Sequence, residues 1–326
     1  MIEVDAGTAR ALAERLRALD IDPGRTLTLP KSDDEGQALA NYWFYLVAIC
    51  QHTVSLQGTI DGRWLRGWDY LEAASRRRLE LFAAGRLSQL TADELRSIFS
   101  DDFDPAASTI DRVEERLGQL HTCARTLLSE YGGDVNELYR RSSGRLAGPG
   151  GILERLAHFE PYRDPVRKKA FLFLEMVGAA GIWDLQDPEF LRVPVDYHIM
   201  RIALRSGLVR VTDAGLERTL KERRPVGEDL DQLIRSRIEE ACDLLVAESG
   251  RGVFHVDMAL WHIGRSCCSY EHGPCCSGCS QPGDCSLVEV LGGACPAECP
   301  LAGACLGSRD PAYRAYWETN VNTSYY

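Results

Sequence analysis

The sequence predicts an all-α fold with a cysteine-rich loop near its C-terminal end. Apolar residues recur with a helical period along most of the chain, and the alternation typical of strands is nearly absent. Nine of the twelve cysteines lie between Cys267 and Cys305. The chain has 326 residues, enough to bury a large core in one large or two medium domains.

The periodic pattern predicts twelve helices. Acceptable caps mark several of their starts, such as Thr91 with Glu94 and Ser108 with Asp111. Glycine- and proline-rich breaks fall at 144–151, 184–194 and 225–227. The expected helices lie near residues 6–19, 34–54, 62–84, 91–99, 108–131, 134–142, 150–158, 165–180, 195–207, 213–223, 228–249 and 255–266.

The composition predicts a soluble protein without a membrane segment. The longest strongly apolar stretch, 42–50, is far too short to cross a bilayer. Residues 1–16 carry charges where a signal peptide needs an apolar core, and no lipidation signal is visible. We therefore expect a cytoplasmic monomer in a reducing compartment.

The net charge of -11 has the wrong sign for holding duplex DNA by bulk electrostatics. A nucleic-acid role would need a local basic patch, although each candidate patch is also typical of a solvated helix face. The candidates are Arg76 to Arg78, Arg163 with Arg167 to Lys169, Arg201 with Arg205 and Arg210, and Lys221 with Arg223 and Arg224.

The cysteine-rich segment contains two arrays of matching spacing. A shift of 20 residues superimposes Cys295, Cys299 and Cys305 on Cys275, Cys279 and Cys285. A close-set run of this kind favours an iron–sulfur cluster, whereas zinc, the second alternative, usually takes two separated short pairs. Disulfides are least favoured because they need an oxidising compartment. The other three cysteines, in apolar helical stretches, are expected to be core residues.

The segment 193–208, VPVDYHIMRIALRSGL, places Asp196 at the start of an amphipathic helix. A carboxylate there can cap free amides, which is a purely structural role. The segment also resembles the V-D-x-H-x-x-R-x-x-x-R-x-G-L stretch of the helix-hairpin-helix base-excision glycosylases, the endonuclease III superfamily. The resemblance implies that Asp196 stabilises the oxocarbenium-like sugar or positions a nucleophile, with Tyr197 beside it as a substrate-binding residue.

The segment 164–170, DPVRKKA, is similar to the G-V-G-R-K-T-A hairpin of the same family. The resemblance implies that Lys168 is an amine nucleophile and that Lys169 lies near the substrate. The alternative is a basic helix start paired with acids. The glycines of the family's hairpin are missing, and around 181–190 the chain has ten more residues before Asp196 than endonuclease III has. Both departures weaken the prediction of duplex binding more than they weaken the prediction of the fold.

The segment 259–268, ALWHIGRSCC, resembles the L-x-x-H-G-R-x-x-C stretch that leads into the family's iron–sulfur loop. Residues 295–305 resemble the C-P-L-x-x-x-C ending of adenine-mismatch glycosylases. These resemblances leave the ligands of a [4Fe–4S] cluster open between two sets, and nine thiols also suffice for two clusters. The sets are Cys268 with Cys276, Cys279 and Cys285, and Cys268 with Cys295, Cys299 and Cys305.

The segment 44–53 resembles the family's L-x-x-x-I-L-S-Q-Q-T helix, which implies that Gln51 and His52 approach the base. A polar end to a buried helix is an equal alternative. Trp64 and Trp68 are four residues apart and are expected on one helix face, where they would stack on a base or pack in the core.

Taken together, the resemblance implies a two-lobed helix-hairpin-helix glycosylase-like fold with the active site in the cleft between the lobes. The implied activity is cleavage of an N-glycosidic bond in DNA, by water or by a lysine, on a base flipped from the stack. A free modified nucleotide of the queuosine type is the first alternative substrate, and a non-enzymatic iron–sulfur protein is the second alternative. The expected parts are 1–60 and 191–266 in one lobe, 61–190 in the other, 267–307 as the cluster loop and 308–326 as a tail.

Overall fold

The computed structural model describes residues 1–22, 36–270, 274–276, 278–279, 285–292, 295 and 297–326. Helices make up most of the described chain and the strands form two small two-stranded sheets, so the all-α class is confirmed. Among these residues, none of the helices is long and apolar enough to span a lipid bilayer.

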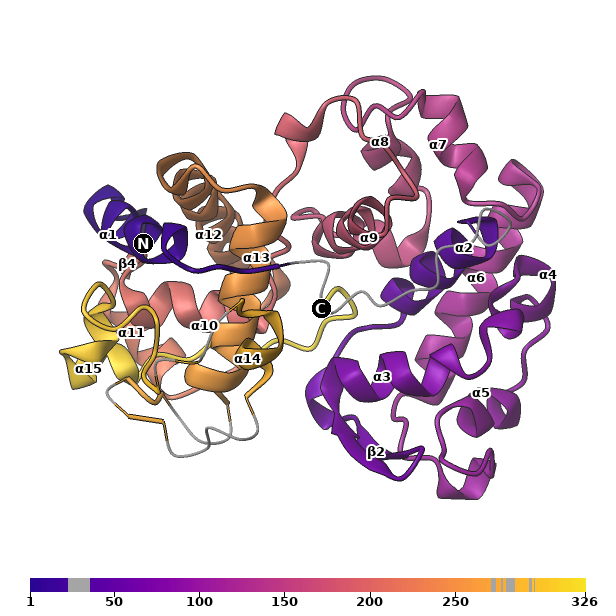
Figure 1. Cartoon of the computed structure of the whole chain (residues 1–326), viewed down its shortest axis with the longest axis horizontal. Helices are drawn as coiled ribbons and strands as arrows, with labels where there is room; N and C mark the ends of the chain where they lie inside the picture. The colour runs from indigo at the N-terminus through magenta and orange to yellow at the C-terminus, as the bar shows by residue number, and fades with distance from the viewer. Residues whose placement is uncertain (23–35, 271–273, 277, 280–284, 293–294, 296) are drawn as a thin grey trace. The chain divides into compact units, whose positions relative to one another are not determined.

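The chain divides into two compact units, each with its own group of helices (Figure 1). Unit 1 comprises Met1–Thr28 and Leu191–Thr323, and unit 2 comprises Leu29–Phe190 and Ser324–Tyr326. The sequence places the first boundary at residue 60, whereas the structure places it near residue 28. The apolar helix between these positions packs inside unit 2, which moves the boundary.

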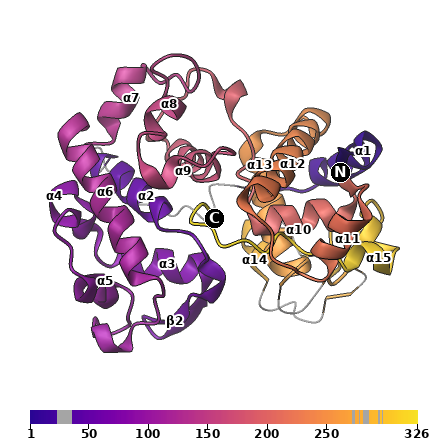
Figure 2. The same cartoon turned by 180° about the vertical axis from the view of Figure 1, so that it is seen from behind.

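Unit 1 is a helical body joined by one short sheet. Strand β1 pairs antiparallel with β4, with Ile2 opposite Val211. Helix α1 packs along α12 (Figure 1 and Figure 2). The described elements are β1 (Ile2–Val4), α1 (Ala6–Arg17), α10 (Tyr197–Ser206), β4 (Val209–Val211), α11 (Ala214–Lys221), α12 (Glu228–Ser249), α13 (Val253–His262), a π turn (Ile263–Cys267), α14 (Ser286–Val290), a 3-10 turn (Leu306–Ser308) and α15 (Pro311–Arg314).

Four helices of unit 1 begin where the sequence offers an aspartate cap. Asp5, Asp196, Asp213 and Asp310 each accept a hydrogen bond from a backbone amide in the first turn of α1, α10, α11 and α15. These caps satisfy amides that have no partner within the helix. Helix α10 ends at Gly207, whose φ of 75° lies in the left-handed region that glycine adopts without strain.

Unit 2 is built around α2. The described elements are α2 (Gly36–Ala48), β2 (Gln57–Ile60), β3 (Arg63–Arg66), α3 (Gly67–Arg76), α4 (Ala84–Leu87), α5 (Ala92–Ile98), α6 (Val113–Tyr131), α7 (Asn136–Ser142), α8 (Ile152–Leu156) and α9 (Lys168–Ala179), with 3-10 turns at Thr53–Ser55, Leu79–Phe82, Pro105–Ala107, Glu160–Tyr162 and Pro188–Phe190.

Helix α2 is buried on all sides from Ala40 to Ala48, which is typical of a helix surrounded by other helices. It packs against α6 and α9. The ring of Phe44 stacks on that of Tyr162, with centroids 5.1 Å apart, and the Tyr162 hydroxyl donates to the Phe44 carbonyl at 2.5 Å. This contact fixes the segment before α9 against the central helix.

The expected helix over 62–84 is wrong in its first part. Residues 57–66 form the hairpin β2–β3, and the helix begins only at Gly67. The turn is Asp61–Gly62, and both residues have positive φ, as a tight two-residue hairpin requires. This dipeptide was the turn signal in the sequence, and the helical spacing of apolar residues around it obscured it.

Candidate functional site

Asp196 lies at the N-terminal end of α10 and is 5% exposed. Its Oδ1 accepts hydrogen bonds from the amides of His198 at 2.8 Å and Ile199 at 3.0 Å. The structural role as a helix cap is therefore present. These bonds also hold the carboxylate in one direction, which is what electrostatic stabilisation of a developing positive charge requires.

His198 was part of the matched motif but received no role from the sequence. Its Nδ1 accepts a hydrogen bond from Arg201 Nη2 at 2.9 Å, so the ring hydrogen is on Nε2. The ring also packs against Tyr197 and Trp261, with centroid distances of 4.2 Å and 5.7 Å. His198 and Arg201 are three residues apart on one helix, and this spacing is the feature of the sequence that predicts contact between their side chains.

Two buried arginines connect α10 to the cysteine-rich tail. Arg201 Nε donates to the carbonyl of Cys268 at 2.9 Å, and its Nη1 pairs with Glu318 Oε2 at 2.9 Å. Arg205 Nη1 lies 3.4 Å from the sulfur of Cys268. The motif arginines are therefore structural partners of the tail.

The two matched segments of unit 1 pack directly on each other. A Cβ at Gly264 would lie 2.8 Å from the Cβ of His198, so only glycine allows this approach. Arg201 Nη2 also donates to the Gly264 carbonyl at 3.0 Å. Segments about sixty residues apart in the sequence thus form one contact surface.

Several thiols of the tail lie close together. All twelve cysteines lie in the described residues and none is in a disulfide. The thiols of Cys267 and Cys299 share a hydrogen bond, which raises the pKa of Cys267 and lowers the pKa of Cys299. The amides of Leu301 and Ala302 also donate to the Cys299 sulfur. Amides directed at a sulfur stabilise a thiolate ligand.

In the described part of the chain, no group of three or more His, Cys, Asp or Glu side chains is gathered closely enough to hold one metal ion. The tail cysteines are the residues whose donor chemistry would suit zinc or an iron–sulfur cluster.

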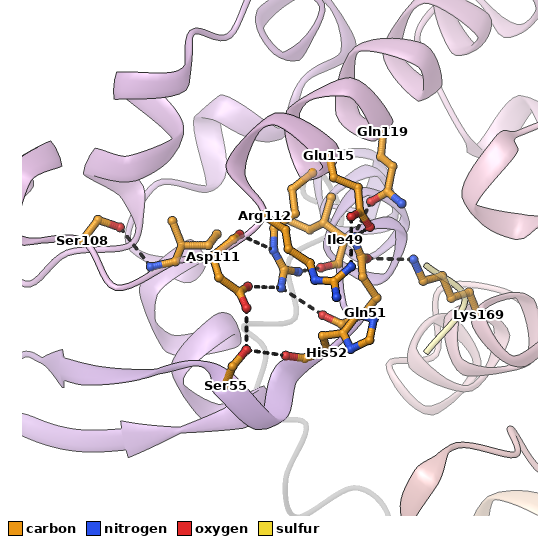
Figure 3. Close-up of polar contacts among 12 residues, drawn as sticks. Ile49, Gln51, His52, Ser55, Ser108, Asp111, Arg112, Glu115, Gln119 and Lys169 are labelled. Atoms are coloured by element: carbon orange, nitrogen blue, oxygen red, sulfur yellow. Dashed lines mark hydrogen bonds and ion pairs between the residues drawn. The ribbon is translucent and has the colours of Figure 1, made fainter. Parts of the chain in front are cut away.

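The site residues of unit 2 form a buried polar network at the C-terminal end of α2 (Figure 3). The Gln51 amide nitrogen donates to Glu115 Oε1 at 3.1 Å and to Gln119 Oε1 at 2.8 Å. Lys169 Nζ donates to Gln51 Oε1 at 3.0 Å and to the Ala48 carbonyl at 2.6 Å. Both amide hydrogens of Gln51 are thus bonded within the protein, whereas the resemblance implied that Gln51 approaches a base.

Arg116 completes this network. Its guanidinium is fully buried and donates to the carbonyls of Ile49 and Gln51 and to Asp111 Oδ1. Burial alone would raise the pKa of Asp111, but hydrogen bonds from Ser55 and Arg116 lower it. Cations at the last carbonyls of a helix end it favourably, which explains why α2 ends at Ala48 and does not continue to residue 54.

The two candidate lysines have different surroundings. Lys169 is fully buried, and its desolvation lowers the pKa of the ammonium group to about 8. Lys168 Nζ lies 3.5 Å from the sulfur of Cys50. Burial therefore favours at Lys169 the uncharged amine that a nucleophile needs, whereas the position matched by the resemblance is Lys168.

The turn before α9 differs from a phosphate-binding hairpin. The Asp164 carboxylate accepts hydrogen bonds from the amides of Val166 at 3.2 Å and Lys168 at 2.9 Å. These amides point towards the inside of the turn and already bind an anionic group. The carboxylate thus occupies the place at which free amides would hold a phosphate.

The remaining candidates are spread over unit 2. His52 has a φ of 50°, and its amide donates to the carbonyl of Tyr326 at 3.2 Å. Trp64 lies in β3 and is 63% exposed, whereas Trp68 lies in α3 and stacks on Trp43 with centroids 6.3 Å apart. The expectation that the two tryptophans share a helix face is therefore wrong, because the helix begins only at Gly67, after Trp64.

Most members of the expected basic patches are buried or paired with acids. Arg201, Arg205, Lys168 and Lys169 are buried. Arg163 and Arg167 are exposed. Ion pairs join Arg76 to Glu72, Arg78 to Glu80, Arg210 to Asp5, Lys221 to Glu217 and Arg224 to Glu222.

No model of a known protein family matches the sequence, and no curated protein matches it. The arrangement of the residues themselves is therefore the basis for assigning a function.

Proposed function

We propose that the chain is an N-glycosylase that cleaves the bond between a damaged or modified base and its sugar in DNA. The proposal is supported by one observation above all. The four segments that resemble endonuclease III meet in pairs, 44–53 with 164–170 in unit 2 and 193–208 with 259–268 in unit 1. Contacts between matched segments are what a shared fold would produce.

Asp196 is the proposed catalytic carboxylate. Cleavage of an N-glycosidic bond leaves positive charge on the sugar, and a carboxylate held in a fixed direction stabilises that charge. The bonds from the His198 and Ile199 amides supply this fixation. Neutral His198, with its hydrogen on Nε2, is placed beside it to orient a substrate hydroxyl or a water.

A lysine would give the enzyme lyase activity. Attack of a neutral amine on the sugar carbon breaks the N-glycosidic bond, and the released base takes up a proton lost by the amine. Opening of the sugar ring, with a second proton passing from nitrogen to the ring oxygen, then gives a Schiff base, which borohydride can reduce once it is protonated. Lys168 is the residue at the matched position, and Lys169 is the residue whose pKa burial lowers to about 8. Variants at both positions distinguish them.

An iron–sulfur cluster in the tail would act structurally. Bound to the tail thiolates, it would hold the segment that Arg201 and Arg205 attach to α10, and so fix the helix that carries Asp196.

The test is base release by mass spectrometry from damaged DNA duplexes with Asp196→Asn. Asparagine caps a helix as well as aspartate does, so the fold should be retained while the charge is lost. We expect base release to fall on the order of a hundredfold. Asp213→Asn, which changes the equivalent cap of α11, is the matched control and should keep full activity. Equal activity of the two variants would refute the role of Asp196.

A free modified nucleoside or nucleotide is a second candidate substrate. The Asp164 carboxylate that occupies the amides of Val166 and Lys168 favours it, as does the pairing of most expected basic residues with acids. A protein gripping duplex phosphates needs cations that are not already neutralised. The same assay with modified nucleotides measures the ratio of kcat/KM between the two substrate classes, and absence of base release from both would leave a non-enzymatic role.

A further inference from the structure

Arg201 on α10 is fully buried, and its guanidinium is bonded in one orientation. Its Nε donates to the Cys268 carbonyl at 2.9 Å, and its Nη1 donates to Glu318 Oε2 at 2.9 Å. Its Nη2 donates to the Gly264 carbonyl at 3.0 Å and to His198 Nδ1 at 2.9 Å. These bonds use four of the five N–H groups of the guanidinium. Arg201 therefore presents a fixed N–H to the ring of His198.

The bond from Arg201 determines which nitrogen of His198 carries a hydrogen. An arginine side chain has only donors and stays charged in proteins, so Nδ1 of His198 must accept with its lone pair. A hydrogen on Nδ1 would direct two N–H groups at each other and place a second positive charge beside the guanidinium. The ring is therefore neutral and carries its hydrogen on Nε2.

The ring of His198 is also held in place by its packing. It is 8% exposed and contacts the rings of Tyr197 and Trp261, with centroid distances of 4.2 Å and 5.7 Å. A half-turn of the ring would exchange Nδ1 for a carbon and leave a buried N–H of Arg201 without an acceptor, which is unfavourable. The orientation with Nδ1 towards Arg201 is therefore the stable one.

Other charged or titratable side chains surround the ring at greater distance. They are Asp196 and Tyr197 on α10, His262 and Arg265, which both pack on Trp261, and Glu318, which pairs with Arg201. The carboxylates favour a protonated ring, whereas Arg265 disfavours it. Arg201 is bonded to the ring itself, so we expect its effect to dominate.

We infer that Arg201 is a positioning residue that keeps His198 neutral with its hydrogen on Nε2, so that His198 acts only as a hydrogen-bond donor. Glu318 in turn holds Arg201 in place. The inference rests on the proposed function for the role of His198 in a reaction, but not on which substrate is cleaved.

The chemical consequence is that His198 neither takes up nor releases a proton during the reaction. Its Nδ1 lone pair is bound to Arg201 and its Nε2 already carries a hydrogen, so it cannot accept a proton from an attacking water. A neutral imidazole is also too weak an acid to protonate a leaving base. The proton that the water loses must go elsewhere, and Asp196 at the same end of α10 is the carboxylate that can accept it.

The test uses nuclear magnetic resonance of the ring nitrogens in the whole protein, labelled with ¹⁵N-histidine, between about pH 6 and about pH 8. His198→Asn identifies the signals of His198 among the seven histidines. We expect Nε2 to carry hydrogen and Nδ1 to lack it throughout this range, whereas an ordinary histidine is half-protonated near about pH 6.5. Protonation of His198 in the wild type over this range would overturn the inference without any variant being made.

A double variant tests whether Arg201 is responsible. Arg201→Met with Glu318→Leu removes both charges together, so neither buried charge is left without its partner. His198 should then become half-protonated near about pH 6.5. Glu318→Gln is the matched control, because glutamine still accepts from Arg201 Nη1 and His198 should stay neutral. A neutral His198 in the double variant would show that burial and not Arg201 sets its state, which would overturn the inference.

Kinetics give a second measurement if the protein releases a base. Relative to wild type, kcat/KM of the double variant should fall about fourfold from pH 8 to pH 6, because about a quarter of His198 remains neutral at the lower pH. Parallel pH profiles of the two proteins would contradict the role of Arg201. If the wild type releases no base, the glycosylase proposal fails, and the resonance experiment still decides whether Arg201 holds His198 neutral.

Discussion

Both units bury cationic side chains beside the segments that resemble endonuclease III, but the two units use different groups to bind these cations. In unit 2, Lys169 and Arg116 donate mainly to backbone carbonyls at the end of α2. In unit 1, Arg201 and Arg205 bind the cysteine-rich tail and the carboxylate of Glu318. The network of unit 2 is closed by its own helices, whereas that of unit 1 is complete only when a distant tail is in place.

The pKa values reflect this difference. Burial lowers the pKa of Lys169 to about 8, because carbonyls compensate a buried charge only in part. Burial alone would also lower the pKa of Arg201, but the charges of Glu318 and Cys268 raise it above its ordinary value. A carboxylate partner thus stabilises a buried positive charge more than neutral carbonyl acceptors do.

Metal removal should produce the largest difference between the two units in protection from hydrogen exchange. If the tail of unit 1 depends on a cluster, chelation under oxidising conditions should speed amide hydrogen exchange in Leu191–Thr323 on the order of a hundredfold. Exchange in the helices of unit 2 should change less than about twofold. Hydrogen exchange measured by mass spectrometry, with mock-treated protein as control, makes the distinction. Equal loss of protection in both units would show that they unfold together.

Loss of the ion pair between Arg201 and Glu318 should have the next largest effect, on the free energy of unfolding. Glu318→Ala leaves a buried guanidinium without its carboxylate, so the free energy of unfolding should fall by about 3 kcal/mol or more. Urea denaturation followed by tryptophan fluorescence measures this change. Glu240→Ala, which removes the exposed pair with Arg237, should cost less than about 1 kcal/mol. Similar losses in the two variants would contradict the role of the buried pair.

Lys169 should give stability a distinct pH dependence. Its folded-state pKa of about 8 lies below its ordinary value of 10.5, so the unfolded chain binds more protons between these pH values. Stability should therefore rise with pH, by roughly 1.5 kcal/mol between pH 8 and 9.5 from this residue.

Lys169→Met should remove that rise and add a constant cost from the lost hydrogen bonds. Urea denaturation of both proteins at several pH values isolates the lysine, because other titrating groups cancel in the difference. Lys168→Met is the companion control and should preserve the pH-dependent rise. Parallel profiles of wild type and Lys169→Met would contradict the lowered pKa.

Trp64 should have the smallest effect on stability. Its side chain is 63% exposed on the hairpin, so Trp64→Ala should change the free energy of unfolding by less than about 0.5 kcal/mol. Buried Trp43 is the contrast, and Trp43→Ala should cost about 3 kcal/mol or more. If Trp64 stacks on a base, Trp64→Ala will instead raise KM in the base-release assay at unchanged stability.

The sequence by itself determined the helical class and the approximate place of most helices. The period of apolar residues is a local property, so 228–249 was expected as a helix and α12 has these bounds. The cap at Asp196 was likewise visible, because a cap bonds to amides only two or three residues away. The hairpin at 57–66 was missed although its Asp61–Gly62 turn is local.

The tertiary structure alone decided which distant groups meet. Nothing in the spacing shows that Cys268 lies beside Arg205, or that Asp164 occupies the amides of its own turn. The adjacent lysines Lys168 and Lys169 are equivalent by sequence, yet only Lys169 reaches the carbonyls that end α2. Periodicity fixes which face of a helix is buried, whereas the choice of partner depends on packing between segments far apart in the chain.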